Sequence, residues 1–421
     1  MPDSLPSWLA YVESQHTQPI ALGLERVDAL RRALGQTKLC PVITVGGTNG
    51  KGSICALLES ILLCAGYRVG LYTSPHFLDY NERVRVNGHS VSDHDLCTGF
   101  AEVEAARNGI PLTYFEFGTL AAWQIFARAR LDVIILEVGL GGRLDAVNVY
   151  ETDCAVVATV DLDHMDYLGS DREQIGLEKA GIFRNGKPAI CSDSNPPASL
   201  LAHADTIGAD LKLIGCDYGF VPQEQQWQFW SWLGKRSGLE HPALKGGIQF
   251  NNASAALATL DSLHEVLPVA ILDVQHGLLG VELPGRFQVI SGKPTLVLDV
   301  AHNPQAASEL AKNLNNMKSH PETWAVFGMM ADKDISGVIR AIKPYVTHWL
   351  VCTLSGSRAA NAAQVAEQLR RDGVTVPIRE YLSAAEAFAY ARGAAGENDR
   401  ILIFGSFLTV ADVMRVLPFR T

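Results

Sequence analysis

The sequence predicts an α/β protein in which helices cover mostly parallel sheets. Short apolar runs alternate with longer stretches of helical periodicity, which is typical of βαβ units. Residues 133–136 (VIIL) and 155–158 (AVVA) are apolar at every position, as expected of strands that are covered on both faces. The chain of 421 residues is longer than one hydrophobic core usually organises, so we expect two domains of unequal size.

The composition indicates a globular protein with a large buried core. Hydrophobic residues make up 48% of the chain and charged residues 19%. The net charge of -10 gives no general attraction to nucleic acid or to an anionic membrane. No stretch approaches the roughly 20 apolar residues that a membrane span needs, and the N-terminus does not read as a signal peptide. We therefore expect a cytoplasmic protein without nucleic-acid or membrane partners, whose scattered cysteines are mostly buried free thiols.

The first predicted domain begins its βα alternation at residues 42–45 (VITV). This strand is followed by a helix through Ala56 and Leu63, and a further helix is expected at 117–129. The stretch 215–247 differs, because tryptophan and phenylalanine are crowded among polar residues and glycines. It predicts an antiparallel hairpin region, and we favour a partly buried aromatic face over a ligand platform.

A domain boundary is predicted at 283–286 (LPGR), where a Pro-Gly turn ends a helical region and a strand begins at 287–290. After this point the alternation restarts. Strands are expected at 296–299, 324–327, 349–352 and 401–404, each followed by a helix. The predicted domains are therefore 1–284 and 285–421, and the second is a smaller α/β domain.

A phosphate-binding loop is predicted at 46–53 (GGTNGKGS). The common pattern is G-x-x-x-x-G-K-[ST], in which backbone N–H groups and the lysine surround the phosphates. Here the spacing before Lys51 is one residue short, and Gly52 separates the lysine from Ser53. A buried strand enters the loop and a helix leaves it, which points unpaired N–H groups at an anion. Phosphate binding is therefore favoured over a purely structural glycine turn.

Other polar residues lie where predicted strands end, which is where ligands bind in open α/β sheets. Glu137 fits either a divalent-cation ligand or an ion-pair partner of Arg143. His164, beside two aspartates, is favoured as a ligand. Lys179 lies in an amphipathic stretch, where a solvated lysine is the default expectation.

The second domain repeats this arrangement at 298–304 (LDVAHNP), where an Asp and a His lie between a strand and a helix. Asn303 before Pro304 is expected to cap that helix, alongside nucleotide contacts from Asp299 and His302.

Six motifs in one order resemble the folylpolyglutamate synthase family, relatives of the Mur ligases. They are 47–53 (GTNGKGS), 73–76 (TSPH), 137–145 (EVGLGGRLD), 162–164 (LDH), 178–182 (EKAGI) and 299–304 (DVAHNP). The segments 21–27 and 113–116 further resemble the bifunctional bacterial branch that also acts as dihydrofolate synthase. The resemblance covers nearly the whole chain. It implies a P-loop, Mur-ligase-like domain over 1–284 and a Rossmann-like glutamate ligase domain over 285–421.

The resemblance also implies the site residues. ATP would be held by Thr48, Asn49, Gly50, Lys51, Gly52, Ser53, Asn252, Arg286 and Asp299, and Mg²⁺ by Ser74, Glu137 and His164. Lys179 matches a lysine that is carbamylated to help hold a second Mg²⁺, and His302 would assist catalysis beside Lys51 and Lys179. The pterin substrate would contact Leu22, Gly23, Leu24, Thr113, Tyr114, Phe115, Glu116, Leu144, Asp145 and Ala146. A monovalent cation and a monomeric state are further expectations of the resemblance.

The implied activity is an ATP-dependent acid–amino-acid ligase. It would join L-glutamate to dihydropteroate and to tetrahydrofolate through an acyl phosphate, with charge neutralisation by Mg²⁺, Lys51 and loop N–H groups. Two alternatives stay open. One is a Mur-type ligase acting on a peptidoglycan precursor, which the segments 113–116 and 74–76 disfavour. The other is a P-loop regulatory ATPase that makes no small-molecule product.

Overall fold

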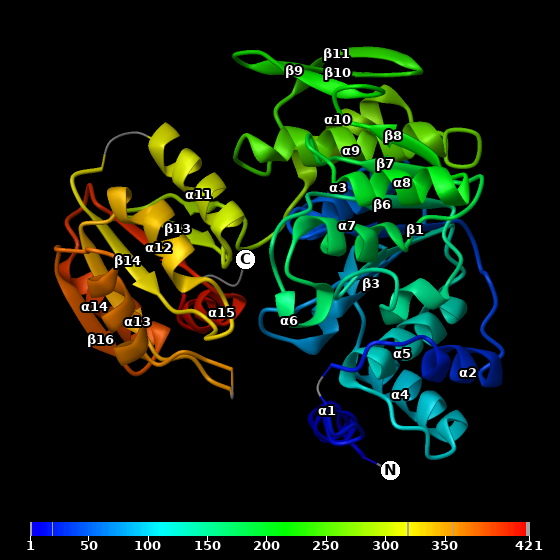
Figure 1. Cartoon of the computed structure of the whole chain (residues 1–421), viewed down its shortest axis with the longest axis horizontal. Coiled ribbons are helices and arrows are strands. Elements are labelled where there is room, and N and C mark those ends of the chain that lie inside the picture. Colours follow the sequence, from blue (N-terminus) through cyan, green and yellow to red (C-terminus); the bar gives the residue numbers. More distant parts are fainter. Residues whose placement is uncertain (1, 19, 318–319, 357, 418–421) are drawn as a thin grey trace. The chain divides into compact units, whose positions relative to one another are not determined.

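The computed structural model describes residues 2–18, 20–317, 320–356 and 358–417 (Figure 1). The chain divides into two compact units. The first contains the described residues up to Ala243 together with Phe250–Val281, and the second contains Leu244–Gln249 together with the described residues from Glu282 onward. Each unit is built around a sheet of its own.

The main sheet of the first unit has eight strands among the described residues, in the order β4-β3-β2-β5-β1-β6-β7-β8. All neighbours from β2 to β8 run parallel, whereas β3 and β4 pair antiparallel at one edge. The bounds are β1 Val42–Gly46, β2 Val69–Tyr72, β3 Val84–Val86, β4 His89–Ser90, β5 Val133–Glu137, β6 Cys154–Val157, β7 Pro188–Cys191 and β8 Asp210–Leu213.

The register of this sheet brings several strand ends to one edge. Val45 of β1 pairs with Glu137 of β5, and Gly46 pairs with Val157 of β6. The loops that follow β1, β5 and β6 therefore emerge side by side, as expected at the carboxyl edge of a parallel sheet.

Helices cover this sheet, and two of them start at N-cap residues that are recognisable in the sequence. α4 and α5 begin at Ser92 and Thr113, each with a capping box that pairs the cap with an acidic residue three positions later. The helical bounds are α1 Leu5–Glu13, α2 Glu25–Ala33, α3 Lys51–Cys64, η1 Tyr80–Arg83, α4 Asp93–Arg107, α5 Tyr114–Ala129, η2 Ala146–Val149, α6 Met165–Leu168, α7 Arg172–Ala180, α8 Ala198–Ile207, α9 Ile248–Ser262 and α10 Ile271–Gly280.

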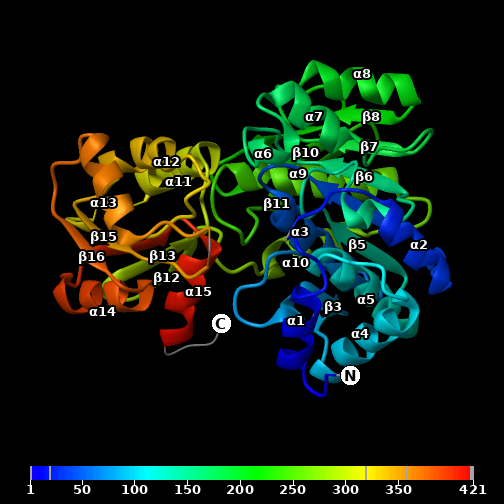
Figure 2. The same cartoon turned by 60° about the horizontal axis from the view of Figure 1, so that its bottom comes forward.

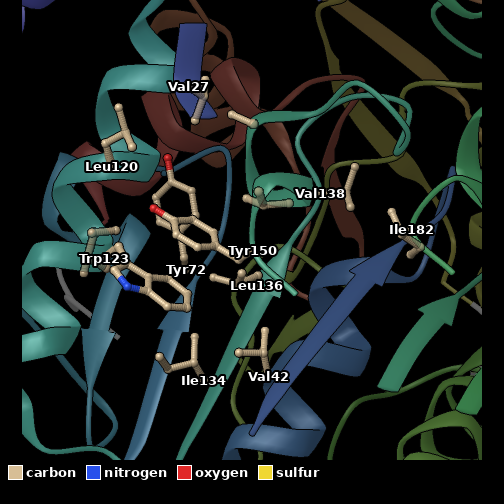
Figure 3. Close-up of a cluster of buried hydrophobic side chains, with 14 of the residues drawn as sticks. Val27, Val42, Tyr72, Leu120, Trp123, Ile134, Leu136, Val138, Tyr150 and Ile182 are labelled. Atoms are coloured by element: carbon tan, nitrogen blue, oxygen red, sulfur yellow. The ribbon is translucent and has the colours of Figure 1, made fainter. Parts of the chain in front are cut away.

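One core cluster of the first unit lies between the sheet and the helices on the side of α5 (Figure 3). Every residue of β1 and β5 is buried, which agrees with the continuous apolar runs in the sequence. Trp123 of α5 stacks on Tyr150 with ring centroids 3.7 Å apart, beside Ile134 and Leu136 of β5. This packing fixes α5, and with it the Thr113 segment that precedes it.

A three-stranded antiparallel sheet confirms the hairpin region predicted at 215–247. Its strands are β9 Gly219–Pro222, β10 Gln226–Ser231 and β11 Gly234–Glu240. Trp227 and Phe229 are fully buried, whereas Trp232 is 39% exposed. The aromatic side chains therefore mainly form a core, as favoured from the sequence.

The second unit has a six-stranded sheet among the described residues, in the order β12-β13-β17-β14-β15-β16. Only the edge strand β12 is antiparallel. Figure 2 shows α11, α12 and α13 on one face of this sheet and α14 and α15 on the other. The bounds are β12 Gln288–Ile290, β13 Thr295–Asp299, α11 Pro304–Asn316, β14 Thr323–Phe327, α12 Ile335–Ile342, η3 Lys343–Tyr345, β15 His348–Cys352, α13 Ala362–Arg371, β16 Ile378–Tyr381, α14 Ala384–Ala394, β17 Arg400–Phe404 and α15 Phe407–Val416.

These two sheets confirm the predicted α/β class with mostly parallel strands. All eight cysteines are free thiols, as expected. Four of them, Cys55, Cys154, Cys191 and Cys352, are buried, which is fewer than the majority that the sequence predicted. Within the described residues, no helix combines the length and apolarity that crossing a bilayer requires.

Candidate active site

The loop between β1 and α3 leaves helix N–H groups available for an anion. Gly50 is the N-cap of α3 and adopts φ 93, and no side chain accepts a hydrogen bond from the first turn. The Lys51 Nζ donates to the carbonyl oxygens of Gly47 and Thr48 at 3.0 and 3.3 Å. The amine therefore lies over its own loop, which is where a phosphate group would meet it.

Two glycines of this loop are required by the close approach of neighbouring segments. A Cβ on Gly47 would lie 2.7 Å from Cβ of Ala158, and one on Gly50 would lie 2.7 Å from Oδ1 of Asn252. Both residues also have positive φ, which disfavours any side chain. The same geometry places the buried Asn252, an expected nucleotide contact on α9, against the loop.

The segment after β6 anchors the loop on its other side. Thr48 donates from its backbone N–H to Thr159 O at 2.6 Å and from its hydroxyl to Asp161 O at 3.0 Å. The backbone N–H of Asp161 in turn donates to the Thr48 hydroxyl at 3.0 Å. Sequence reasoning did not single out Thr159 or Asp161 as anchors, although both follow a strand end as polar residues.

Glu137 ends β5 as a buried carboxylate beside the Ser74 segment. Its Oε2 accepts a hydrogen bond from the backbone N–H of Ser74 at 3.0 Å. The ion-pair alternative with Arg143 is wrong, because Arg143 pairs with Glu178 at 2.6 Å. Glu137 is thus kept at the strand end, close to Val45 and to the start of the phosphate loop.

His164 lies after β6, at the start of α6, in the left-handed region with φ 52. Its Nε2 is 4.0 Å from Oδ2 of Asp163, and its side chain is 31% exposed. The structure therefore places His164 on the same edge of the sheet as the loop after β1, beside a carboxylate as the sequence indicated.

These residues fit a divalent cation of the Mg²⁺ type. Among the described residues, no three or more His, Cys, Asp or Glu side chains gather as a complete metal cage. Mg²⁺ is commonly held by one or two carboxylates, with water and nucleotide phosphates completing the shell. The buried Glu137 carboxylate with Ser74 beside it matches such an incomplete set.

Lys179 is buried, which corrects the default expectation of a solvated lysine. Burial lowers the pKa of Lys179 to about 7, with the charge of Lys51 acting in the same direction and those of Asp163 and Asp145 opposing it. About half of the amine is therefore neutral near pH 7, and charges from three other segments act on it.

The segment carrying Asp145 packs directly on the end of α7. The Arg143 backbone N–H donates to Glu178 O at 2.7 Å, and a Cβ on Gly142 would lie 2.7 Å from that same oxygen. The Asp145 carboxylate accepts N–H groups of Leu140 and Val147 at 2.8 and 3.0 Å. Burial raises the pKa of Asp145 to about 7, although these N–H groups and Lys51 act to lower it.

The three segments expected to contact a pterin are brought together. The Gly23 N–H donates to Leu144 O at 3.4 Å, which joins the first segment to the third. The Phe115 ring faces Gly139, where a Cβ would lie 2.8 Å from the ring. Glu116 accepts from the Thr113 N–H at 2.7 Å, so this segment is held as a helix cap.

Arg26 completes this arrangement, and sequence reasoning did not single it out. It pairs with Glu116 at 2.7 Å and also donates to Ala21 O at 2.8 Å. Its position in the segment 21–27 was the one clue in the sequence to a role at the site. The sequence could not show the ion pair, because Glu116 lies 90 residues further along the chain.

The second unit presents its own set of polar residues after β13. Asp299 accepts the N–H groups of Phe287 and Ala301 at 2.8 and 2.7 Å. Burial raises the pKa of Asp299, opposed mainly by the Arg286 charge. The His302 Nδ1 is 2.8 Å from Val300 O, and because a carbonyl oxygen only accepts, Nδ1 is the donor in this contact.

Asn303 caps α11 by accepting from the Ala306 N–H at 2.9 Å, as the sequence predicted. Asp299, His302 and Asn303 therefore lie on one loop, with Arg286 beside it.

Comparison with family models divides the chain into two known modules. Residues 45–260 match the Mur ligase middle domain, and residues 285–407 match the glutamate ligase domain of Mur ligases.

Individual proteins match over nearly the full length. The chain is 45% identical over 417 residues to the dihydrofolate synthase/folylpolyglutamate synthase of Escherichia coli strain K12, covering 99% of this chain and 96% of that protein. It is similar to solved E. coli FolC in complex with DHPP and ADP, with a TM-score of 0.94, 44% identity and 99% of both chains covered. A bifunctional folylpolyglutamate synthase/dihydrofolate synthase with Mn, AMPPNP and L-glutamate bound gives a TM-score of 0.91 at 43% identity, with 99% of this chain and 98% of that chain covered.

Proposed function

This chain belongs to the dihydrofolate synthase/folylpolyglutamate synthase family of Mur ligases, and from that premise we propose how its residues carry out the reaction. It is an ATP-dependent ligase that joins L-glutamate to dihydropteroate, forming dihydrofolate, and to tetrahydrofolate, forming folylpolyglutamates. The observation that best supports the proposed site is the uncapped start of α3 at Lys51, beside Glu137 and the buried Lys179.

The first step activates a carboxylate, which is a poor electrophile in water. We propose that an oxygen of the pteroate or folate carboxylate attacks the γ-phosphorus of ATP, so that ADP leaves and an acyl phosphate forms. Lys51 and the N–H groups at the start of α3 would neutralise charge on the transferring group, and Thr48 and Asn49 are further proposed nucleotide contacts. Asn252, Arg286 and Asp299 are proposed nucleotide contacts, of which Asn252 already touches the loop.

The second step forms the amide. The amino nitrogen of L-glutamate attacks the acyl carbon, inorganic phosphate leaves, and the nitrogen loses a proton. We assign this proton to His302, whose ring is oriented by the hydrogen bond from Nδ1 to Val300 O. The reaction needs no covalent bond between substrate and protein.

A divalent cation, which we take to be Mg²⁺, supplies charge neutralisation on the phosphate oxygens when it is bound. Ser74, Glu137 and His164 are its proposed ligands. From the resemblance we also propose that a monovalent cation binds. The proposed ligand set draws support from the Ser74–Glu137 contact.

Lys179 is proposed to be carbamylated and to help hold a second Mg²⁺. A neutral amine adds CO₂ and releases one proton, whereas an ammonium cannot. The lowered pKa of Lys179, about 7, keeps a neutral fraction available near neutral pH. Burial also shields the carbamate from the water that would reverse its formation.

Leu22 to Leu24, Thr113 to Glu116 and Leu144 to Ala146 are proposed to hold the pterin. Their support is the hydrogen bond from Gly23 to Leu144 and the contact of Phe115 with Gly139, in the loop that leads to Leu144. We further propose that the enzyme acts as a monomer in the cytoplasm, where free thiols such as its eight cysteines persist.

Phosphate release tests this function against the two alternatives. The ligase should release phosphate from ATP only when both L-glutamate and a pteroate or folate are present. A regulatory ATPase would hydrolyse ATP without them, and a Mur-type ligase would instead require a nucleotide-linked peptidoglycan precursor. Release that is independent of glutamate and folate would contradict the proposal.

A further inference from the structure

Arg83 is the last residue of η1, and its guanidinium lies over two aromatic rings. The guanidinium carbon is 5.2 Å from the ring centroid of Tyr80 and 5.5 Å from that of Tyr114. Its Nε donates to Nδ1 of His76 at 2.8 Å. Tyr80 is buried, and Arg83 itself is half-buried. The cation is therefore partly removed from water.

Arg83 has no carboxylate partner within the part of the chain that the structure describes. Arg26, the other arginine near the proposed pterin segments, is neutralised by Glu116 at 2.7 Å. Aromatic faces attract a guanidinium, but less strongly than a paired carboxylate does. Arg83 is thus a half-buried cation whose counter-charge is not supplied by a described residue.

The position of Arg83 joins two segments of the proposed site. Its carbonyl oxygen accepts from the Thr73 N–H at 2.9 Å, which places it beside the segment leading to Ser74 and Glu137. Its guanidinium lies over the ring of Tyr114, which is itself a proposed pterin contact. An anion bound by the Arg83 guanidinium would therefore lie near His76 of the one segment and Tyr114 of the other.

The hydrogen bond to His76 leaves one edge of the guanidinium for a ligand. Because Nε is engaged, the two terminal nitrogens form the remaining edge, and two parallel N–H groups match the two oxygens of a carboxylate. Neither terminal nitrogen has a hydrogen-bond acceptor among the described residues.

We propose that Arg83 binds a carboxylate of the pterin-bearing substrate. This inference rests on the proposed function and adds a residue to it. Two substrate groups share this chemistry. One is the carboxylate that reacts, which both substrates carry, and the other is the α-carboxylate of the glutamate tail, which tetrahydrofolate has and dihydropteroate lacks.

Steady-state kinetics of Arg83→Gln with each substrate tests the proposal. Loss of a charge-assisted pair should raise KM at least about tenfold for every substrate whose carboxylate is bound. Arg83→Lys, which keeps the charge but loses the planar edge, should lie between the wild type and Arg83→Gln. KM for ATP should not change.

The matched control is Arg128→Gln on α5, which carries Tyr114 at its other end. Arg128 forms an exposed pair with Glu102, so this variant makes the same change in net charge and should leave both KM values unchanged. Melting temperatures of the variants, together with Arg83→Lys, separate a binding defect from a folding defect.

A rise in KM for tetrahydrofolate alone supports binding of the tail carboxylate, and a rise for both substrates supports binding of the reacting one. Unchanged KM values in a folded, active Arg83→Gln enzyme would overturn the inference while leaving the ligase function intact. A fall in kcat without a change in KM would overturn it as well. Absence of ligation in the wild-type chain would instead overturn the proposed function, and this inference with it.

Discussion

The β1–α3 and β13–α11 connections share one topology but treat their helix starts in opposite ways. Each runs from a parallel strand through a short loop into a helix. α3 begins at Gly50 without a side-chain cap, whereas Asn303 caps α11 through the Ala306 N–H. The first loop carries the cation Lys51, and the second carries the carboxylate Asp299, whose oxygens accept backbone N–H groups of its own unit.

This difference teaches that topology alone does not make a phosphate site. A helix start attracts an anion only if its N–H groups are left unpaired and no carboxylate occupies the same place. Among the described residues, the first turn of α3 meets both conditions. In the β13–α11 loop, Asp299 and Asn303 accept the N–H groups of Ala301 and Ala306, so these oxygens suit contacts to neutral or basic parts of a ligand.

Lys51→Ala should produce the largest effect. Removing the cation from the uncapped helix start should lower kcat for ligation by at least about 10³-fold, because transition-state charge on the phosphoryl group loses its main protein counter-charge. Coupled phosphate release measures it. Lys312→Ala on α11, an exposed lysine paired with Glu309, is the control and should keep full activity. Retained turnover in Lys51→Ala would remove the contrast between the two loops.

Lys179→Ala should also be inactive, but a short carboxylate such as acetate should partly restore turnover. Acetate would replace the proposed carbamate at the second cation. A wild-type rate in Lys179→Ala without any additive would reject the carbamate.

The pH dependence of stability and of carbamate formation gives a second test of the role proposed for Lys179. Its folded pKa of about 7 lies below its ordinary value of 10.5, so the unfolded chain binds the extra proton between these values. The stability of the unmodified enzyme should therefore rise as pH increases from about 7 towards about 10, and carbamate should build up as pH rises through about 7. Carbon NMR with labelled CO₂ and urea titrations measure the two effects. Lys179→Met should show neither.

Gly50→Ala should raise KM for ATP about tenfold, since positive φ and the Asn252 contact both oppose a side chain there. Gly66→Ala is the matched control, because Gly66 has φ 83 but nothing lies within 4 Å of an added Cβ. Both variants should lose stability, and only Gly50→Ala should lose ATP affinity. Equal ATP affinity in the two variants would contradict the role given to the loop.

Asn303→Ala should have the smallest effect. Loss of the α11 cap should lower the free energy of unfolding by about 1 kcal/mol. Asn361→Ala, which removes a comparable cap from α13, gives the reference value in the same denaturation experiment. If Asn303→Ala does not change stability, the Asn303 side chain does not stabilise the start of α11. The proposed contrast with the uncapped start of α3 would then be wrong.

The sequence predicted most of the fold because buried parallel strands leave continuous apolar runs, as in β1 and β5. It did not predict β16, whose Arg379 and Glu380 are exposed at the edge of the sheet. Strand periodicity disappears where a strand is neither buried nor alternating.

The candidate site was predictable where one segment carries the chemistry. Lys51 follows from the strand–loop–helix pattern alone. The burial of Lys179 does not, because it depends on packing by the segment of Gly142 and Arg143. The choice of Glu178 over Glu137 as the partner of Arg143 likewise depends on which distant segments the fold brings together.

The most direct test of the ligase function is the mass of the product. The enzyme is incubated with ATP, Mg²⁺ and L-glutamate, together with either dihydropteroate or tetrahydrofolate. We predict that each pterin substrate gains the mass of one glutamate residue, with one ADP and one phosphate formed for each addition. ATP consumed while both pterins keep their original mass would contradict the account.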